Sequence, residues 1–346
     1  MTDMEKETGH SGTGMEYRQV SWLRSLASRA GVAGMLACCA MVIMAVIWFQ
    51  LFHINPPLSG TFIDVCAGDS IRDVSEQLYA TGITSSPQSL RRYWQLRRGG
   101  SLRTGRYLLT GVDDMRELYL LFAKGSPVTV RVTIPEGYTV RQIAGRFQEE
   151  AGISAGDFLA AAGSDAGNLL EGYLFPDTYD VLYAGDARDI VARMQKRFAE
   201  ILPVDWESAA RSRGLTSDEL VIVASIIERE VRYDNDRPLA GSVIFNRLAA
   251  DMFLQMDATL GYVLPSHDGF YSSEELKDPS PYNTYVHPGL PPTAICNPGL
   301  ASLEAAAHAP ATGYYYFLAK PDGHCVFART FAEHERNIRR YLSGGN

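Results

Sequence analysis

The sequence predicts an α+β protein with a single N-terminal transmembrane helix, a small strand–helix module, and then a mostly helical α+β domain. Three observations predict this order. Residues 31–52 are apolar and carry no charge, a strand, a helix and a glycine recur within 61–83 and 128–153, and helical patterns dominate around residue 228. A chain of 346 residues has room for two folded units and a tail, because domains usually span roughly 100–200 residues.

The composition narrows the classes of function. The net charge is −8 and the pI about 5.4, which argues against binding of nucleic acid, because phosphate neutralisation needs a basic surface. The seven histidines form no HExxH motif, so we expect neither a metal nor another cofactor. The cysteines fit neither a metal knuckle nor a disulfide framework. They are Cys38, Cys39, Cys66, Cys296 and Cys325.

The apolar segment 31–52 predicts a membrane anchor. It has 22 positions without charge, and a transmembrane helix needs about 20 apolar residues. Trp48 and Phe49 stand near its end, where interfacial aromatic residues collect. A signal peptide and a buried core helix are the alternatives. The segment is too long for a signal-peptide core and shows no small-x-small cleavage site, so the anchor is the preferred interpretation.

The charges around the anchor predict its orientation. Arg18, Arg24 and Arg29 precede it, and the first charge after it is Asp64. Basic flanks stay in the cytoplasm. We therefore predict a flexible, aperiodic cytoplasmic tail at 1–30, a linker at 53–60, and an extracytoplasmic (periplasmic) remainder held at the cell membrane.

Two stretches of the chain echo each other, which predicts repeated small modules. Residues 66–83 align with 135–153, with apolar residues at i, i+3 and i+7 of a helix and a glycine followed by isoleucine at the end. A strand pattern precedes each copy, at 61–65 and at 128–134. Only two copies are visible, so a solenoid is not expected.

Helices and proline-rich loops make up the rest of the chain. Thr216 and Glu219 form a capping-box pattern that starts the helix carrying Glu228. A turn-rich aromatic segment, LEGYLFPDTY, lies at 170–179, and a proline-rich loop at 279–299. Further helices are predicted at 186–200, 238–249, 300–309 and 331–342, with a strand at 314–319.

The stretch ASIIEREV (224–231) runs from apolar residues into two carboxylates. Glu228 and Glu230 lie about 200° apart on a helix, so they face opposite sides. Glu228 stands above Ala224 and Ser225, whose small side chains would leave room for a substrate and a dry site that raises its pKa. Glu230 is interpreted as structural, bonded to a neighbouring loop. The alternative for Glu228 is a surface pair with Arg232, worth about 0.2–0.5 kcal/mol.

Side chains suited to sugars follow on two loops. LQMDAT supplies Gln255 and Asp257, and the loop that begins SPYNTY supplies Tyr282, Asn283 and Tyr285. Amides and tyrosines on rigid loops hydrogen-bond and stack on sugars. Each residue alone is a weak signal, but together with a semi-buried acid they indicate a carbohydrate groove.

These motifs together resemble the endolytic peptidoglycan transglycosylase MltG (YceG-like) family. The matching segments run in order from the anchor to the C-terminus: PEGYT, EGYLFPDTY, ASIIERE, SVIFNRL, LQMDAT and YNTYVHPGLPPTAICNPG. The resemblance implies a LysM-like module at 61–127 and a catalytic domain at 128–346. It also implies that Glu228 is the catalytic acid. We expect Gln255, Asn283 and Tyr285 to hold the sugar, with Asp257 as a nearby charge.

The implied chemistry is lytic cleavage between N-acetylmuramic acid and N-acetylglucosamine, which leaves a 1,6-anhydro end. Most glycosidases need two carboxylates. If the C6 hydroxyl of the substrate is the nucleophile, Glu228 can serve first as acid and then as base, with a pKa near the working pH. The resemblance further implies peptidoglycan synthases as partners and a role in limiting glycan strand length.

Several positions depart from the family pattern, and two other functions stay open. Val231, Met256 and Ala258 differ from it, and His324 stands one place early, with Cys325 where a histidine is expected. A hydrolytic peptidoglycan glycosidase could use Glu228 with Asp257 or Asp177. A non-catalytic cell-wall-binding scaffold would use the anchor and modules alone.

Overall fold

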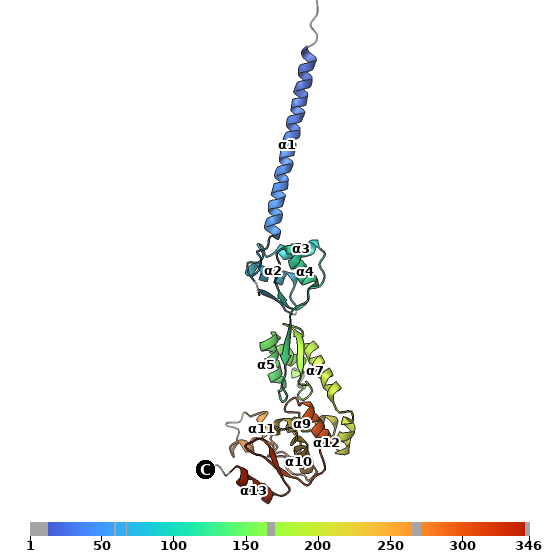
Figure 1. Cartoon of the computed structure of the whole chain (residues 1–346), viewed down its shortest axis with the longest axis vertical. Coiled ribbons are helices and arrows are strands. Elements are labelled where there is room, and N and C mark those ends of the chain that lie inside the picture. Colours follow the sequence, from blue (N-terminus) through green and yellow to red (C-terminus); the bar gives the residue numbers. More distant parts are fainter. Residues whose placement is uncertain (1–12, 59, 67, 165–169, 265–270, 343–346) are drawn as a thin grey trace, which may run out of the picture. The chain divides into compact units, whose positions relative to one another are not determined.

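The computed structural model describes residues 13–58, 60–66, 68–164, 170–264 and 271–342 (Figure 1). The chain forms two compact units. The first holds most residues up to 126, and the second holds residues 127 onward together with the short segments 64–68 and 104–107.

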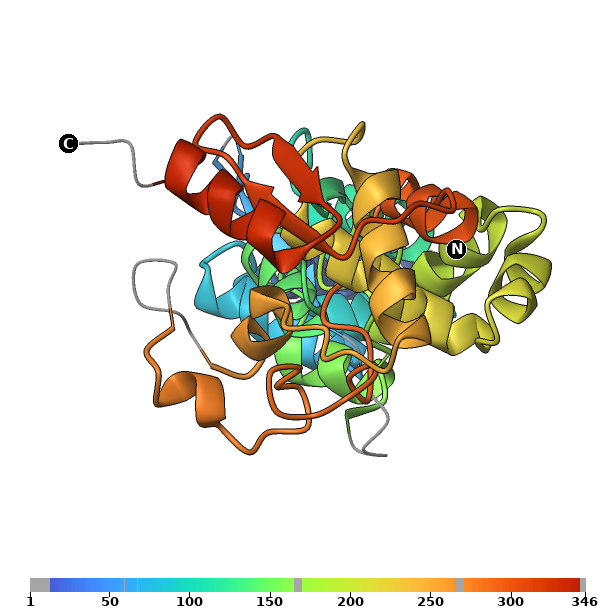
Figure 2. The same ribbon diagram turned by 90° about the horizontal axis from the view of Figure 1, so that it is seen from below.

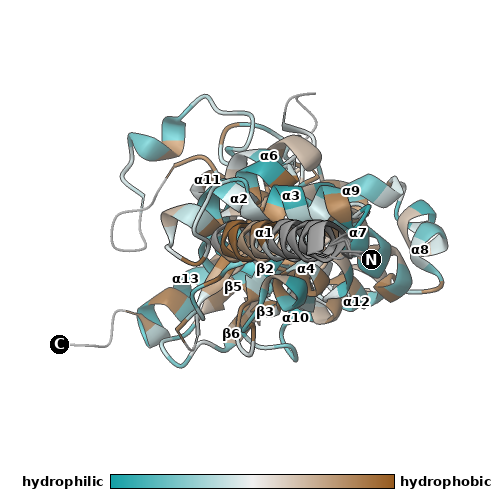
Figure 3. Cartoon of the chain, turned by 90° about the horizontal axis from the view of Figure 1, so that it is seen from above, coloured by the Kyte–Doolittle hydropathy of each residue, from teal (hydrophilic) through white to brown (hydrophobic). Residues whose placement is uncertain are grey.

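The first unit begins with a helix of 40 residues, α1 (Thr13–Phe52). Its segment Gly31–Phe49 is exposed and, among the described helices, the one long and apolar enough to cross a membrane; Figure 3 shows it in brown. The expectation of an aperiodic tail is wrong for residues 13–30, because no proline interrupts this stretch and the helix continues through it. Residues 1–12 of that predicted tail lie outside the described residues.

After α1, the chain forms a small strand–helix–helix–strand arrangement. The carboxylate of Asp73 accepts a hydrogen bond from the backbone N–H of Ser70 at 2.7 Å, which fixes the start of the first short helix. That helix ends next to Gly82, whose φ is +75°. The elements are β1 (Phe62–Val65), α2 (Ile71–Ala80), α3 (Ser89–Leu96), β2 (Gly105–Leu108) and α4 (Met115–Lys124), with β1 paired to β2.

The second unit opens with the same order of elements, so the repeat extends further than the sequence pattern indicated. Its strands are antiparallel, with Val130 opposite Val181 and Val132 opposite Tyr179. The helix α5 ends at Gly152 with a φ of 65°. The elements are β3 (Thr129–Thr133), α5 (Val140–Ala151), α6 (Ala155–Ala161), β4 (Thr178–Leu182) and α7 (Ala187–Ile201).

A helical region and a C-terminal hairpin complete the second unit. Figure 2 shows the hairpin and the last helix side by side, both in red. The predicted helices and the strand in this region are confirmed within two residues at each end. The elements are α8 (Trp206–Ser212), α9 (Ser217–Glu230), α10 (Arg237–Ala249), α11 (Asp257–Gly261), η2 (Glu275–Lys277), α12 (Leu300–His308), β5 (Tyr316–Ala319), β6 (Cys325–Ala328) and α13 (Phe331–Tyr341).

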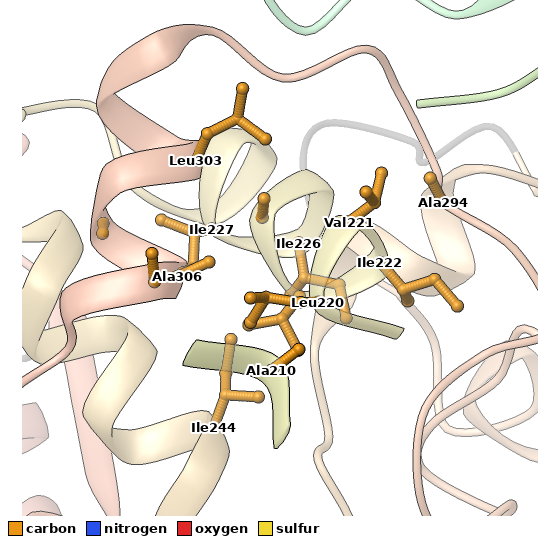
Figure 4. Close-up of a cluster of buried hydrophobic side chains, with 14 of the residues drawn as sticks. Ala210, Leu220, Val221, Ile222, Ile226, Ile227, Ile244, Ala294, Leu303 and Ala306 are labelled. Carbon is orange, nitrogen blue, oxygen red and sulfur yellow. The ribbon is translucent and has the colours of Figure 1, made fainter. Parts of the chain in front are cut away.

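The helix α9 is the centre of the main hydrophobic core. All residues from Leu220 to Ile227 are buried, and Figure 4 shows Ile227 and Ile226 among side chains of α10 and α12, such as Ile244 and Leu303. Burial of each large aliphatic side chain contributes about 1.5–3 kcal/mol. The predicted capping box is confirmed, since Glu219 N–H donates to Thr216 Oγ1. The core thus holds α9 firmly up to its acidic end.

Candidate active site

The two glutamates at the end of α9 enter different surroundings. The helix ends at Glu230, and Val231 has an extended backbone with φ −121°. Positions 228 and 230 point to different sides of the helix, as the spacing predicted. They therefore contact different parts of the chain.

Glu228 is fixed in a buried ion pair. Its Oε2 accepts hydrogen bonds from Arg237 Nη1 at 2.8 Å and from the Gly299 N–H at 3.0 Å. The side chains of Glu228 and Arg237 are 6% and 7% exposed. Arg237 also contacts the Ser302 hydroxyl. The alternative of a surface pair with Arg232 is therefore wrong, because the guanidinium that reaches Glu228 comes from the start of α10.

The space predicted above Ala224 and Ser225 is filled by protein. Both residues are fully buried. Ile295 N–H donates to Ser225 Oγ at 3.1 Å, and Cys296 Sγ donates to Ser225 O at 3.4 Å. The small side chains let residues 294–296 pack closely on α9. They do not form the floor of a substrate groove, and that expectation is wrong.

Glu136 lies beside Glu228, which the sequence analysis missed. Burial raises its pKa first, and the charge of Glu228 raises it further. Gly137, with φ +77°, brings the PEGYT turn close to Glu228 Cγ. A side chain at Gly299 would collide with the Glu136 carboxyl. The glycine of PEGYT was noted as a turn signal, but its glutamate gave no signal of its own.

Glu230 lines a cleft of about 470 Å³, within the usual range for ligand sites. Gln255, Asp257 and Tyr285 line the same cleft, so three of the four predicted sugar-binding residues meet there. Glu228 is not among the cleft residues. The structure thus gathers the predicted sugar-binding side chains around the glutamate that was interpreted as structural.

The environment of Glu230 favours its protonated form. Burial raises its pKa to about 7, a hydrogen bond from the Ala258 N–H opposes this shift, and the charge of Asp257 adds to it. Glu230 Oε1 accepts from the Ala258 N–H at 2.9 Å, so the bond predicted to a neighbouring loop is made instead to the first turn of α11. A pKa near neutrality is the property that general acid–base catalysis requires. Glu230 is therefore held in place by a hydrogen bond and is suited to proton transfer.

Two loops are hydrogen-bonded to each other and form one side of this cleft. Gln255 N–H donates to Thr284 O at 3.1 Å, and Met256 N–H donates to Thr284 Oγ1 at 3.0 Å. Gln255 has a φ of 49°, a left-handed conformation that costs free energy for residues other than glycine. Asp257 Oδ1 accepts a hydrogen bond of 2.6 Å from the Tyr285 hydroxyl. These contacts set the side chains around Glu230.

Asn283 does not lie in the cleft. It is fully buried, and its Nδ2 donates to Leu276 O at 3.1 Å and to Asp278 O at 2.9 Å. Its Oδ1 accepts from the Tyr285 N–H. This geometry contradicts a direct sugar contact, because every polar group of the amide holds the loop. Tyr282 likewise does not line the cleft, and its hydroxyl lies 2.7 Å from Thr293 Oγ1.

Arg247, on the SVIFNRL segment, lines the cleft and holds two segments of its wall. Its Nε donates to Tyr315 O at 2.7 Å and its Nη1 donates to Leu254 O at 2.6 Å. Its guanidinium lies 5.1 Å from the centre of the Tyr316 ring. Arg247 thus joins the loop before Gln255 to the C-terminal hairpin. From the sequence, this motif is recognisable only as part of the family pattern, without a role of its own.

Glu171 joins two of the family motifs, EGYLFPDTY and the NPG end of the YNTY segment, in a buried network. It is buried, and it accepts hydrogen bonds from Val140 N–H, Tyr262 Oη and Asn297 Nδ2 at 3.0, 3.0 and 3.1 Å. Burial raises its pKa to about 7. Asn297 also accepts from Gly172 N–H. The polar residues of EGYLF and NPG are therefore structural groups of a buried network.

The remaining candidates lie elsewhere. Asp177 Oδ2 accepts from Arg197 Nε at 2.8 Å, and the His324 ring stacks on Tyr233 with centroids 4.1 Å apart. Neither lines the Glu230 cleft. Two larger hollows of about 640 and 610 Å³ are lined by neither Glu228 nor Glu230. Within the described ranges, no group of three or more His, Cys, Asp or Glu could hold a metal ion.

The profile of the YceG-like family matches residues 63–340. The chain belongs to this family. A relative from Bacillus subtilis (strain 168), named endolytic murein transglycosylase, is 30% identical over 308 residues, covering 82% of this chain and 85% of the relative. One from Streptococcus pneumoniae with the same name is 26% identical, and the match covers 81% of this chain but 58% of that longer protein.

A solved structure has the same fold over most of the family region. The crystal structure of a yceG-like protein from Listeria monocytogenes aligns with a TM-score of 0.53 and 30% sequence identity, covering 80% of this chain and 99% of that one. The family resemblance stated from the motifs is confirmed.

Proposed function

We propose that this chain is a membrane-anchored endolytic murein transglycosylase whose general acid is Glu230, in place of the Glu228 predicted from the sequence. The observation that carries the assignment is the position of Glu230 in a cleft shared with Gln255, Asp257 and Tyr285. The names of the relatives support the reaction class. The raised pKa of Glu230, about 7, supports its role as proton donor.

Glu228 is suited to a positioning role. Its carboxylate accepts from a buried guanidinium and from a backbone N–H, and it lies outside the cleft. Hydrogen bonds from charged donors favour the ionised form and fix its orientation. Glu228 would then hold the end of α9 against α10 and the start of α12, so that Glu230 keeps its place.

The reaction follows from one carboxyl group that acts twice. Protonated Glu230 donates its proton to the bridging oxygen as the bond from that oxygen to C1 of N-acetylmuramic acid breaks. The C6 hydroxyl of the same sugar then attacks C1, and its proton passes to the Glu230 carboxylate. The products are a 1,6-anhydro end and a new C4 hydroxyl, and Glu230 is again protonated. No water is consumed.

A hydrolytic glycosidase is the second candidate, because Asp257 lies in the same cleft as Glu230. A pair of carboxyl groups can activate water or form a covalent intermediate. Asp257 is bonded to Tyr285, however, and it raises the pKa of Glu230. Digestion in ¹⁸O water separates the two: a reducing end that carries ¹⁸O supports hydrolysis, and a 1,6-anhydro end supports the lytic reaction.

Two matched variants of the full-length chain in detergent test the acid. Glu230→Gln should abolish release of anhydro fragments from sacculi, with a loss of at least about 10²–10⁴-fold. Glu228→Gln should retain cleavage at a temperature where it is folded. Circular dichroism confirms folding of both. If Glu230→Gln still cleaves and folded Glu228→Gln does not, the general acid is Glu228. If the wild-type chain binds strands but never cleaves them, a non-catalytic scaffold is supported instead.

The anchor and the module define how the site would reach its substrate. We place residues 31–52 in the cell membrane with the basic N-terminal flank in the cytoplasm and the second unit outside. The strand–helix–helix–strand order of residues 62–108 supports a LysM-like, wall-binding module. Protease added to intact spheroplasts should then digest residues after 60. Cross-linking to peptidoglycan synthases, and longer glycan strands in cells that lack the protein, test the expected partners and strand-limiting role.

A further inference from the structure

The cleft around Glu230 has a second wall that the sequence analysis did not identify. Phe331 and His334 of α13 and Tyr316 of β5 line the same cleft as Glu230 and Gln255. The three rings form one cluster: Tyr316 and His334 stack at 5.4 Å with an interplanar angle of 26°, and Tyr316 and Phe331 lie 5.9 Å apart. The wall comes from the last 31 residues of the chain, beyond the loops predicted to bind sugar.

Phe331 presents an unusual surface for an aromatic residue. It is 58% exposed, although Tyr316 and His334 beside it are half-buried. An exposed phenylalanine in a cleft leaves a ring free for a ligand. One face of a pyranose ring carries mainly C–H bonds, and these pack well on the negative face of an aromatic ring.

One ring nitrogen of His334 is hidden from solvent. Its Nδ1 is buried and has no hydrogen-bond partner among the described residues. Burial lowers the pKa of His334, and the charge of Arg247 lowers it further. A proton on Nδ1 would be buried without an acceptor, which is costly. The neutral ring therefore carries its proton on Nε2, on its other edge, and can donate there.

We propose that Phe331 and His334 form a subsite for one N-acetylated hexose of the glycan strand, next to the reacting bond. Phe331 packs on the apolar face of the sugar, and His334 Nε2–H donates to an acceptor such as the acetamido carbonyl oxygen. The subsite rests on the proposed function, because continuity with the Glu230 cleft is what identifies its occupant as a glycan. The C-terminal hairpin and helix thus form part of the active site.

The test uses peptide-free glycan strands and the full-length chain in detergent. Phe331→Ala should raise KM by roughly fivefold to tenfold and leave kcat within about twofold, since the contact is equal in the ground and transition states. In a Glu230→Gln background, the same substitution should raise the measured Kd by a similar factor. Phe331→Tyr should restore binding. His334→Leu should weaken binding similarly, whereas His334→Gln, which keeps a donor near the Nε2 position, should weaken it less.

Leu342→Ala is the matched control, because Leu342 is 50% exposed directly after α13 and does not line the cleft. It should leave Kd and KM unchanged. Unchanged Kd and KM in both Phe331→Ala and His334→Leu would overturn the subsite, whatever the acid proves to be. Cleavage by Glu230→Gln with a raised KM in Phe331→Ala would instead sink the proposed acid and leave the subsite standing.

Discussion

Glu228 and Arg237 form an ion pair of 2.8 Å in which both side chains are more than nine-tenths buried. The pair joins the last turn of α9 to the first turn of α10, and the Gly299 N–H extends it to the start of α12. Three helices that are separate in the sequence therefore meet at one carboxylate. We expect this ion pair to stabilise the second unit and to keep Glu230 in its place.

Breaking this pair should destabilise the second unit. Arg237→Met leaves the Glu228 carboxylate buried with only backbone support, at a cost of about 3–5 kcal/mol. Adding Glu228→Gln should recover part of that loss, because the unpaired charge is removed. Thermal unfolding followed by near-ultraviolet circular dichroism measures both. Arg211→Met is the control, since its pair with Glu207 is largely exposed and worth about 0–1 kcal/mol; equal losses in the two single variants would contradict this interpretation.

The pH profile of cleavage should follow Glu230. Because the acid must start protonated and its pKa is raised to about 7, kcat/KM should be level below that pH and fall about tenfold per unit above it. Asp257→Asn removes a charge that raises this pKa, so the falling limb should move to lower pH. Release of anhydro fragments across pH 5–9, an assay range of about four units, measures the limb. A limb that stays in place would show that another group governs it.

We expect Gln255 to lower the stability of the folded chain while its side-chain amide supports cleavage. Its φ of 49° is strained for a side-chain-bearing residue. Gln255→Gly should stabilise the chain by about 0.5–1 kcal/mol, after the extra flexibility of glycine in the unfolded state, while cleavage falls because the amide is lost. Asp251→Gly is a matched control with φ 53° outside the cleft. It should stabilise similarly and leave cleavage unchanged, and a loss of cleavage there would contradict a specific role for Gln255.

Glu171 should make stability depend on pH. Its folded-state pKa, about 7, lies above the ordinary value of 4.5, so the folded state binds the proton more tightly than the unfolded state. Its contribution is therefore present in full below pH 4.5 and is lost as the pH rises through about 7. At roughly 1.4 kcal/mol per pKa unit, the change is on the order of 3 kcal/mol.

Glu171→Gln should flatten this dependence. The amide oxygen can still accept from Val140 and Asn297, and the Tyr262 hydroxyl can turn to accept from the amide nitrogen. Thermal unfolding between pH 4.5 and 7, across the window of the shift, compares this variant with wild type and with the exposed Glu207→Gln. The same slope in all three would mean that Glu171 does not titrate in this window.

The sequence by itself determined the elements whose signals are local. The 22 uncharged positions of the apolar segment, the Thr216 capping box, the glycines at 82 and 152, and the family motifs each depend on neighbours within a few residues. The apolar run before Glu228 also predicted the correct helix and the correct opposition of Glu228 and Glu230. Short elements such as α3 and β4 were missed, because they are stabilised mainly by packing on distant segments.

Only the tertiary structure decided which glutamate faces the cleft. Helical spacing separates Glu228 from Glu230, but it does not tell which side is covered by chain and which is open. The side of Glu228 is covered by residues 294–296, which are distant in the sequence, and by Arg237, which follows after a turn. Met256, Asp257, Tyr285 and the C-terminal wall surround Glu230. Burial and the resulting shift of the pKa depend on such long-range contacts, so the roles of the two acids could be assigned only from the folded chain.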